Sequence, residues 1–205
     1  MTIYRRFKIF SNAINRWKGL IMPRLFTALE IPRDAALSLS LLRGGLPGAH
    51  WVEAEDYHIT LRFFGDISNE MADELLNALD RIKKQPFKIR LSGIDVFGSK
   101  KPHSLYARVE PCEELTQLQS DIVRIANRLG INPDKAKFVP HVTIARLKQV
   151  KLEDLLRYLS SRGNFSSDYF AVTRFVMMSS RESVGGGPYI IEDSWSLNGT
   201  QPELF

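Results

Sequence analysis

The chain has 205 residues, of which 44% are hydrophobic and 25% charged, a composition typical of a folded domain with a sizeable core. No apolar run approaches the roughly 18 residues that a membrane-spanning helix needs, so no span is expected. The net charge of +5 arises in residues 1–21, which hold five basic residues and no acidic one; without them 23 basic residues balance 23 acidic ones. The basic pI therefore does not predict charge-driven coating of nucleic acid, and any such contact must come from a local site.

The N-terminal segment, residues 1–21, has the pattern of a basic amphipathic helix. Its apolar residues recur every three or four positions, at Ile3, Phe7, Phe10, Ile14, Trp17 and Ile21. A helix on an anionic membrane or on RNA, a helix packed on the domain and a dispensable extension all fit this pattern. Met22 followed by Pro23 looks like a native start. We therefore favour a dispensable extension, followed by one domain spanning 22–205.

Periodicity and turn residues predict alternating strands and helices in the first half of the chain. We expect a strand at 24–31, a helix at 33–43, a loop through His50 and Trp51, a strand at 57–64, a helix at 69–85 and a strand at 87–97 with a bulge at Gly93.

The second half repeats this alternation. We expect a basic loop at 98–103, a strand at 104–110, a helix at 111–129, a strand at 138–147, a helix at 152–162, a long strand at 165–179 and a last strand at 189–197. Cys112 is the only cysteine and follows Pro111 in an acidic stretch, which gives a thiolate no support. An inert thiol is typical of a reducing compartment, so we expect a cytoplasmic protein.

Two of the predicted strands carry the same pattern, His-x-Thr followed by an apolar residue. Side chains alternate along a strand, so His58 and Thr60 share one face, as do His141 and Thr143. The intervening residues are expected to bury the other face: Ile59, Leu61, Val142 and Ile144. A single histidine on a strand is more often a surface or structural residue. Because half of the four histidines fall in this one pattern, we favour a functional pair in which two imidazoles form an acid/base couple and two hydroxyls bind an oxyanion such as phosphate.

The two motifs belong to an internal repeat. A His-x-Thr strand, a helix and a strand beginning with Phe follow one another at 57–97 and again at 140–180, and the motif histidines lie 83 residues apart. This predicts an α+β fold of two related halves, each with an antiparallel sheet and flanking helices, with a shared cleft between them.

The paired motifs at this separation resemble the 2H phosphoesterase superfamily. The stretches that carry the closer resemblance, to the RNA 2′,3′-cyclic phosphodiesterases also called 2′-5′ RNA ligases, are 24–29, 58–61, 63–66, 140–146 and 180–189. The resemblance covers about residues 22–197. It implies a bilobal fold, metal-independent opening of an RNA terminal 2′,3′-cyclic phosphate to a 2′-phosphate, and reversible 2′-5′ joining of RNA ends.

The resemblance also implies roles for individual residues. It makes His58 the general acid and His141 the general base. Thr60 and Thr143 would hold the phosphate oxygens. Two further substrate-binding residues follow from it: Arg146, which matches an arginine five residues after the second motif histidine, and Phe26, which matches a first-strand aromatic that can contact a base. It implies no metal and no cofactor, and a monomer that acts on RNA with cyclic-phosphate ends, such as tRNA fragments.

Arg146 poses a geometrical question. Five residues after His141, a regular strand points its side chain to the opposite face, so it reaches the cleft only if the strand bulges or ends near Ala145. Otherwise it is a surface salt-bridge partner. If it does reach the cleft, its charge is expected to lower the pKa of His141 and keep that imidazole neutral, as a base requires.

Some features leave the substrate open. Tyr106 stands where the family commonly has Trp, and the loop containing Lys100, Lys101 and His103 replaces one that often carries arginines, so the RNA-end preference is undetermined. His50 is expected to be a structural or exposed loop residue. A related activity on a small cyclic nucleotide or an oligonucleotide 3′ end, and a non-catalytic RNA-binding module, are the alternatives. The intact motifs argue against the last, and neither motif has the ligand spacing of a zinc site.

Overall fold

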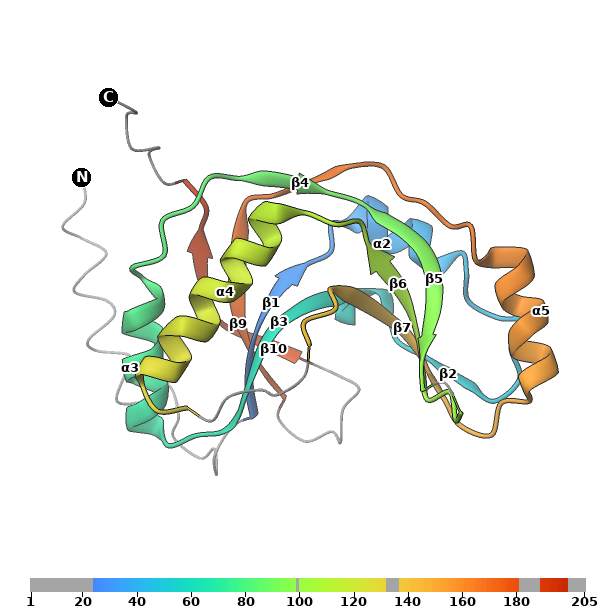
Figure 1. Ribbon diagram of the computed structural model, residues 1–205, viewed down its shortest axis with the longest axis horizontal. Helices are drawn as coiled ribbons and strands as arrows, with labels where there is room; N and C mark the ends of the chain where they lie inside the picture. The colour runs from blue at the N-terminus through green and yellow to red at the C-terminus, as the bar shows by residue number, and fades with distance from the viewer. Residues whose placement is uncertain (1–23, 99, 132–136, 181–188, 199–205) are drawn as a thin grey trace.

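The computed structural model describes residues 24–98, 100–131, 137–180 and 189–198 (Figure 1). The extension predicted at 1–21 lies outside these ranges. The first half of the chain contains β1 (Arg24–Glu30), α2 (Arg33–Ser40), β2 (Ala49–Trp51), the 3-10 helix η1 (Ala54–Asp56), β3 (His58–Asp66), α3 (Asn69–Leu79), β4 (Phe87–Ile89) and β5 (Leu91–Phe97). The second half contains β6 (Ser104–Val109), α4 (Glu113–Arg128), β7 (His141–Leu147), α5 (Leu152–Arg162), β8 (Phe170–Val172), β9 (Arg174–Ser180) and β10 (Tyr189–Ser196).

The strands form one antiparallel sheet whose order reveals the duplication. The order is β10-β9-β1-β3-β7-β6-β5, with β2 added on β7. If β1, β3 and β5 of the first half are equated with β6, β7 and β9 of the second, the central six strands read the same from either end. An approximate two-fold axis therefore passes between β3 and β7, which are joined by the single pair Ile59 and Val142. The predicted α+β fold of two related halves is confirmed.

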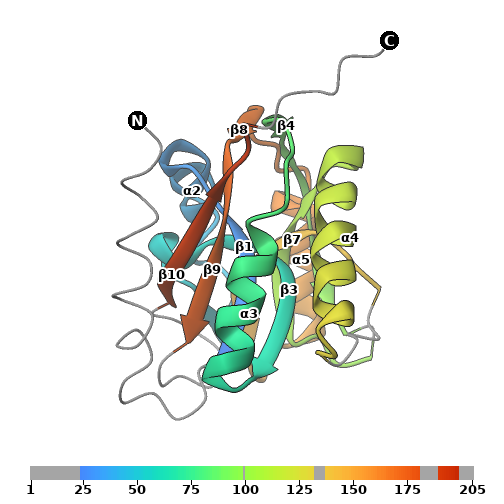
Figure 2. The same cartoon turned by 90° about the vertical axis from the view of Figure 1, so that its left-hand side faces the viewer.

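The chain crosses from one half to the other after α3 and after α5, the helices that follow the two motif strands. After α3 it runs through β4 into β5, which lies in the opposite half, and after α5 it runs through β8 into β9. The crossing strands β4 and β8 pair with each other in a separate two-stranded sheet at one end of the molecule (Figure 2). Each half is thus completed by a strand from the other copy of the repeat, which ties the two halves together.

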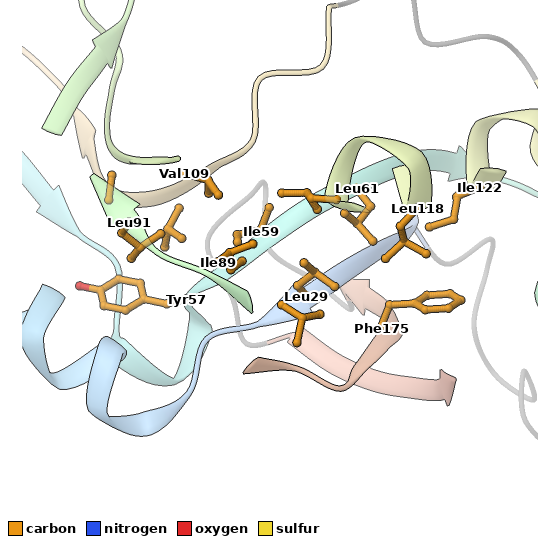
Figure 3. Packing of buried hydrophobic residues seen from close by; sticks show 14 of the residues in the cluster. Leu29, Tyr57, Ile59, Leu61, Ile89, Leu91, Val109, Leu118, Ile122 and Phe175 are labelled. Atoms are coloured by element: carbon orange, nitrogen blue, oxygen red, sulfur yellow. The ribbon is translucent and has the colours of Figure 1, made fainter. Parts of the chain in front are cut away.

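The helices bury their apolar sides against one face of the large sheet. Buried side chains from β1, β3, α4 and β9 meet in this core, among them Leu29, Ile59, Leu61, Leu118, Ile122 and Phe175 (Figure 3). The four apolar residues of the two motifs all belong to it, as predicted. On β1 the alternate residues Phe26 and Ala28 join a small second cluster with Val176 and Met178. The sheet therefore has a helix-covered core face and an opposite face that carries the motif histidines.

Two predicted helices are shorter than their apolar periodicity indicates. The helix expected at 33–43 ends at Ser40, and the helix expected at 69–85 ends at Leu79. In both cases the chain continues in tight turns, with the amide of Leu42 bonded to the carbonyl of Leu39 and that of Ile82 to that of Leu79. Ile82 is still buried, so the apolar pattern continues along the chain beyond the end of the helix.

Four other expectations need correction. The long strand expected at 165–179 is divided into β8 and β9, because the chain turns at Thr173 from pairing with β4 to pairing with β1. The second motif strand begins at His141, not at 138, and α4 begins at Glu113, not at 111. His50 lies on the short strand β2, not in a loop. Within the described ranges, no helix is long and apolar enough to cross a membrane.

Candidate active site

The two motif histidines are the first residues of β3 and β7. Since Ile59 pairs with Val142 in antiparallel register, the next positions along the ladder set His58 against Thr143 and Thr60 against His141. All four side chains leave the sheet on the face opposite the core. The imidazoles stand at diagonal corners of this square, a relation that separates residues by about 7–8 Å in a regular antiparallel pair. The fold therefore brings together the four residues that the motifs single out.

Each imidazole is held by a backbone carbonyl two residues before it. Nδ1 of His58 lies 2.7 Å from the carbonyl oxygen of Asp56, and Nδ1 of His141 lies 2.7 Å from that of Val139. A carbonyl oxygen only accepts hydrogen bonds, so Nδ1–H is the donor in both rings. This fixes the tautomer and leaves Nε2 of each ring for the site, either unprotonated as a base or protonated as an acid.

Burial lowers the pKa of both imidazoles from the ordinary value of histidine. The hydrogen bonds to the carbonyls of Asp56 and Val139 act in the opposite direction, and the charge of His141 lowers the pKa of His58 further. Arg146 is not among the groups that move the pKa of His141, so the expected influence of its charge is not found.

Aromatic rings enclose both histidines in a matching way. His58 has Phe26 at 5.2 Å and Tyr189 at 4.9 Å between ring centroids. His141 has Phe97 at 4.8 Å, with an edge-to-face angle of 78°, and Tyr106 at 5.2 Å. These rings remove water from the imidazoles, which is the physical cause of their lowered pKa.

The position of Phe26 does not favour the base contact expected for it. Its side chain is only 2% exposed, because it packs between His58, Tyr189 and Phe63. Phe63 lies over it at 5.3 Å between centroids and is 57% exposed. On this side of the site Phe63 is the aromatic face that is open to a base, whereas Phe26 supports the imidazole.

A β-bulge brings Arg146 to the face that carries the histidines. Leu105 pairs with Ala145 and Tyr106 with Thr143, so Ile144 is an extra residue on β7. Ile144 and Ala145 are both buried in the core, and Arg146 returns to the half-exposed side shared with His141 and Thr143. The bulge that Arg146 needs in order to reach the face of the histidines is therefore present.

The first motif strand has the same irregularity. Thr27 pairs with Arg62 and Ala28 with Thr60, so Leu61 is the extra residue on β3. Phe63 then occupies the place that corresponds to Arg146. The two halves thus share the bulge but offer different chemistry after it, an aromatic ring in one and a guanidinium in the other.

The structure places a third histidine, His50, on the same sheet face, although the sequence predicts a loop at this position. His50 pairs with Arg146 across β2 and β7, and its side chain is exposed. Paired residues on neighbouring strands point to the same face, so His50 lies on the sheet face of the motif histidines. A strand of three residues is too short to show alternation in the sequence, so the position of His50 on β2 could not be predicted. His103 is exposed, and its backbone amide closes the turn between β5 and β6 on the carbonyl of Phe97.

A pocket of about 420 Å³ opens beside the motifs. Its walls come from β3, β5, α4 and the segment that leads into β7, and they include Thr60, Phe63, Phe97, Gln119, Val123, Lys137 and His141. Among the described residues, no group of three His, Cys, Asp or Glu side chains is arranged to hold a metal ion. The site offers paired imidazoles, hydroxyls and exposed aromatic and cationic side chains, which suit a phosphoester attached to a base.

Comparison with known proteins places this chain in a family. The chain matches the family model for LigT-like phosphoesterases over residues 29–106 and 108–189. The protein belongs to the LigT-like phosphoesterase family. The resemblance to the 2H phosphoesterases that the motifs indicated is thereby confirmed.

Sequence relatives agree with this assignment, and solved structures share the fold. The RNA 2′,3′-cyclic phosphodiesterase of Aquifex aeolicus is 34% identical over 154 residues, which are 73% of this chain and 82% of that protein. The enzyme of the same name from Aeropyrum pernix is 34% identical over 137 residues, 65% of this chain and 77% of that protein. The crystal structure of Escherichia coli LigT complexed with 3′-AMP has a TM-score of 0.72 at 23% identity and covers 86% of this chain and 99% of that chain. A crystal structure of a Thermus thermophilus protein has the same TM-score and identity, over 86% and 98% of the two chains. The likeness to these structures shows the shared fold.

Proposed function

We propose that this LigT-like phosphoesterase hydrolyses the terminal 2′,3′-cyclic phosphate of RNA to a 2′-phosphate and also joins RNA ends reversibly through 2′-5′ bonds. The observation that carries the proposal is the square of two imidazoles and two hydroxyls at the junction of β3 and β7, in which both Nδ1 atoms are held by carbonyls. The names of the relatives support the choice of substrate.

The proposed reaction is an in-line displacement at phosphorus. Neutral His141 takes a proton from water at its Nε2, and the water oxygen forms a bond to phosphorus while the bond to the ribose 3′ oxygen breaks. Protonated His58 donates the proton at its Nε2 to that 3′ oxygen. The product carries a 2′-phosphate, and the two histidines return to their starting protonation states by exchange with solvent.

The remaining groups stabilise charge on the phosphate. The hydroxyls of Thr60 and Thr143 donate to its non-bridging oxygens, and the guanidinium of Arg146 adds a positive charge from the bulge of β7. Phe26 holds the ring of His58. The assignment of acid and base rests on the family resemblance, because the two carbonyl-held imidazoles are nearly equivalent by geometry.

The pKa directions fit this chemistry once substrate is bound. In the free protein burial favours the neutral form of both imidazoles. An anionic phosphate between them attracts a proton, which raises their pKa and lets one ring carry the charge that an acid requires. The substrate thus helps to set the protonation state in which it reacts.

The wider setting is part of the proposal. We expect a monomer in the cytoplasm that acts on RNA with cyclic-phosphate ends, such as tRNA fragments. We also expect the domain to span 22–205 and to work without residues 1–21.

The test compares an oligonucleotide ending in a 2′,3′-cyclic phosphate with a 2′,3′-cyclic mononucleotide. We expect the wild type to favour the oligonucleotide in kcat/KM, and we expect His58→Ala and His141→Ala each to lose nearly all hydrolysis of it. A preference for the mononucleotide would assign a small cyclic nucleotide as substrate. Full activity of both variants would remove the imidazoles from the mechanism.

A further inference from the structure

A second concave surface lies on the helical side of the molecule, between the end of α3 and the second half of α4. These helices contact each other. The groove between them has a volume of about 410 Å³. It is lined by Ala78, Arg81, Ile82, Lys83, Lys84, Asp121, Arg124, Ile125, Arg128 and Leu129, and we call it the α3–α4 groove.

Positive charge gathers in this groove. It holds five basic side chains and one acidic side chain, Asp121. Asp121 is 3.0 Å from Lys84 and 2.8 Å from Arg124, so it partly neutralises these two. The other three are Arg81, Lys83 and Arg128, for which the described part of the chain provides no ion pair. The nearby carboxylate of Asp80 accepts a hydrogen bond from the indole of Trp195.

The groove holds more basic side chains than its single carboxylate can pair with. At other places on the described surface, several basic side chains each pair with one acidic side chain: Arg24–Asp66, Arg43–Glu53, Arg90–Glu110, Arg157–Asp154 and Arg174–Glu30. Beyond residues 1–21 the chain has as many acidic as basic residues. The groove is thus a local concentration of positive charge in a body whose total charge is balanced, and a concave surface focuses its field on an anionic ligand.

Helix α4 connects the groove with the candidate active site. Gln119 and Val123 line the pocket that contains Thr60 and His141, whereas Arg124 and Arg128 line the groove. The two concavities are separated by the width of one helix, about 10 Å. An RNA strand whose end lies at His141 can therefore continue around α4 into the groove.

We propose that the α3–α4 groove binds the phosphate backbone of single-stranded RNA upstream of the cyclic-phosphate end. Arg81, Lys83 and Arg128 contact phosphates, and the half-buried apolar side chains of Ile125 and Leu129 contact the bases. This inference rests on the proposed function, because it takes RNA as the substrate. It gives the enzyme a preference for long RNA over a bare cyclic nucleotide.

The experiment uses the double variant Arg81→Gln/Arg128→Gln, which removes one cation from each wall. Binding is measured by fluorescence anisotropy with a 2′-phosphate-ended RNA of about 16 nucleotides, the upper end of single-strand site sizes. We expect weaker binding than in the wild type and a salt dependence reduced by about 0.7 in log–log slope for each lost phosphate contact, or about 1.4 for the pair. The kcat/KM for a dinucleotide ending in a cyclic phosphate should stay at the wild-type value, because a dinucleotide does not reach the groove.

The matched control is Lys148→Gln/Lys151→Gln, which removes the same charge from exposed positions next to α5 in the other half of the molecule (Figure 1). Equal loss of RNA binding in the control and the groove variant would overturn the proposal, as would unchanged binding in the groove variant. Vesicles containing phosphatidylserine form a further arm; if their binding, and not that of RNA, depends on Arg81 and Arg128, the groove is a lipid site and the proposal is wrong. Failure of the wild type to open the cyclic dinucleotide would instead refute the proposed function, and the binding comparison would still decide the role of the groove.

Discussion

The hydroxyls of the two motifs allow a quantitative test of the account. Valine has nearly the shape of threonine, so Thr60→Val and Thr143→Val remove one hydroxyl each without leaving a cavity. A hydrogen bond to a charged group contributes about 1.5–3 kcal/mol. If each hydroxyl holds a phosphate oxygen in the transition state, each variant should lose roughly tenfold to a hundredfold in kcat/KM, since about 1.4 kcal/mol corresponds to a factor of ten. The near two-fold symmetry predicts similar losses for the two.

Thr27 provides the matched control for these variants. It lies on the neighbouring strand β1, is fully buried, and its hydroxyl has no hydrogen-bond partner among the described residues. Thr27→Val should therefore leave kcat/KM unchanged and should leave the free energy of unfolding equal or higher, because it removes an unsatisfied polar group. The assays are steady-state hydrolysis of a cyclic-phosphate oligonucleotide and urea unfolding. Losses below about threefold for both motif variants, or a loss for Thr27→Val as large as theirs, would refute the reasoning.

Three further predictions concern the histidines and the N-terminal segment. Because burial lowers the pKa of both imidazoles, the pH profile of kcat/KM, which reports the free enzyme, should peak below about pH 6.5. Bound phosphate should move the optimum of kcat to higher pH. Coincident profiles for the two constants would contradict this. With a nitrophenyl phosphodiester, whose leaving group needs no proton, His58→Ala should recover much of its lost rate and His141→Ala should not; rescue of His141→Ala alone would reverse the two roles. A chain that begins at Met22 should keep kcat/KM within about tenfold of the full chain, and a larger loss, above about 1.4 kcal/mol, would make residues 1–21 part of the working site.

The sequence predicts the motif strands and their facing because strand alternation is local. His58 and His141, their threonines and the buried residues between them follow directly from the period of two. The repeat in turn predicts two related halves. What it does not predict is the exchange of β5 and β9 between the halves, because pairing partners depend on the whole chain.

The bulges are the feature of the site that could not be derived from the sequence. At Leu61 and Ile144 a residue is extra only relative to the partner strand, so the register of β1 and β6 decides it. The bulge at Ile144 settles the face of Arg146, which a regular strand would place on the wrong side. The rings around the imidazoles have the same origin, since Phe97 and Tyr189 come from β5 and β10, distant in the chain from the motifs they pack against.

The ends of helices and the short strand β2 could not be predicted from the sequence for another reason. Ile82 remains buried after α3 has ended, so apolar spacing overstates the helix. Strand β2 has too few residues to show alternation, so the sequence predicts a loop at His50. The α3–α4 groove needs two helices that are adjacent only in the folded chain, so its charge is invisible in the sequence.

The most direct test of the central claim is the identity of the product formed from an oligonucleotide that ends in a 2′,3′-cyclic phosphate, with a metal chelator present. Acid/base catalysis by His58 and His141, with the 3′ oxygen as leaving group, predicts a 2′-phosphate as the only product and a rate unaffected by the chelator. A 3′-phosphate, or activity that is lost with the chelator and restored by a divalent ion, would contradict the account.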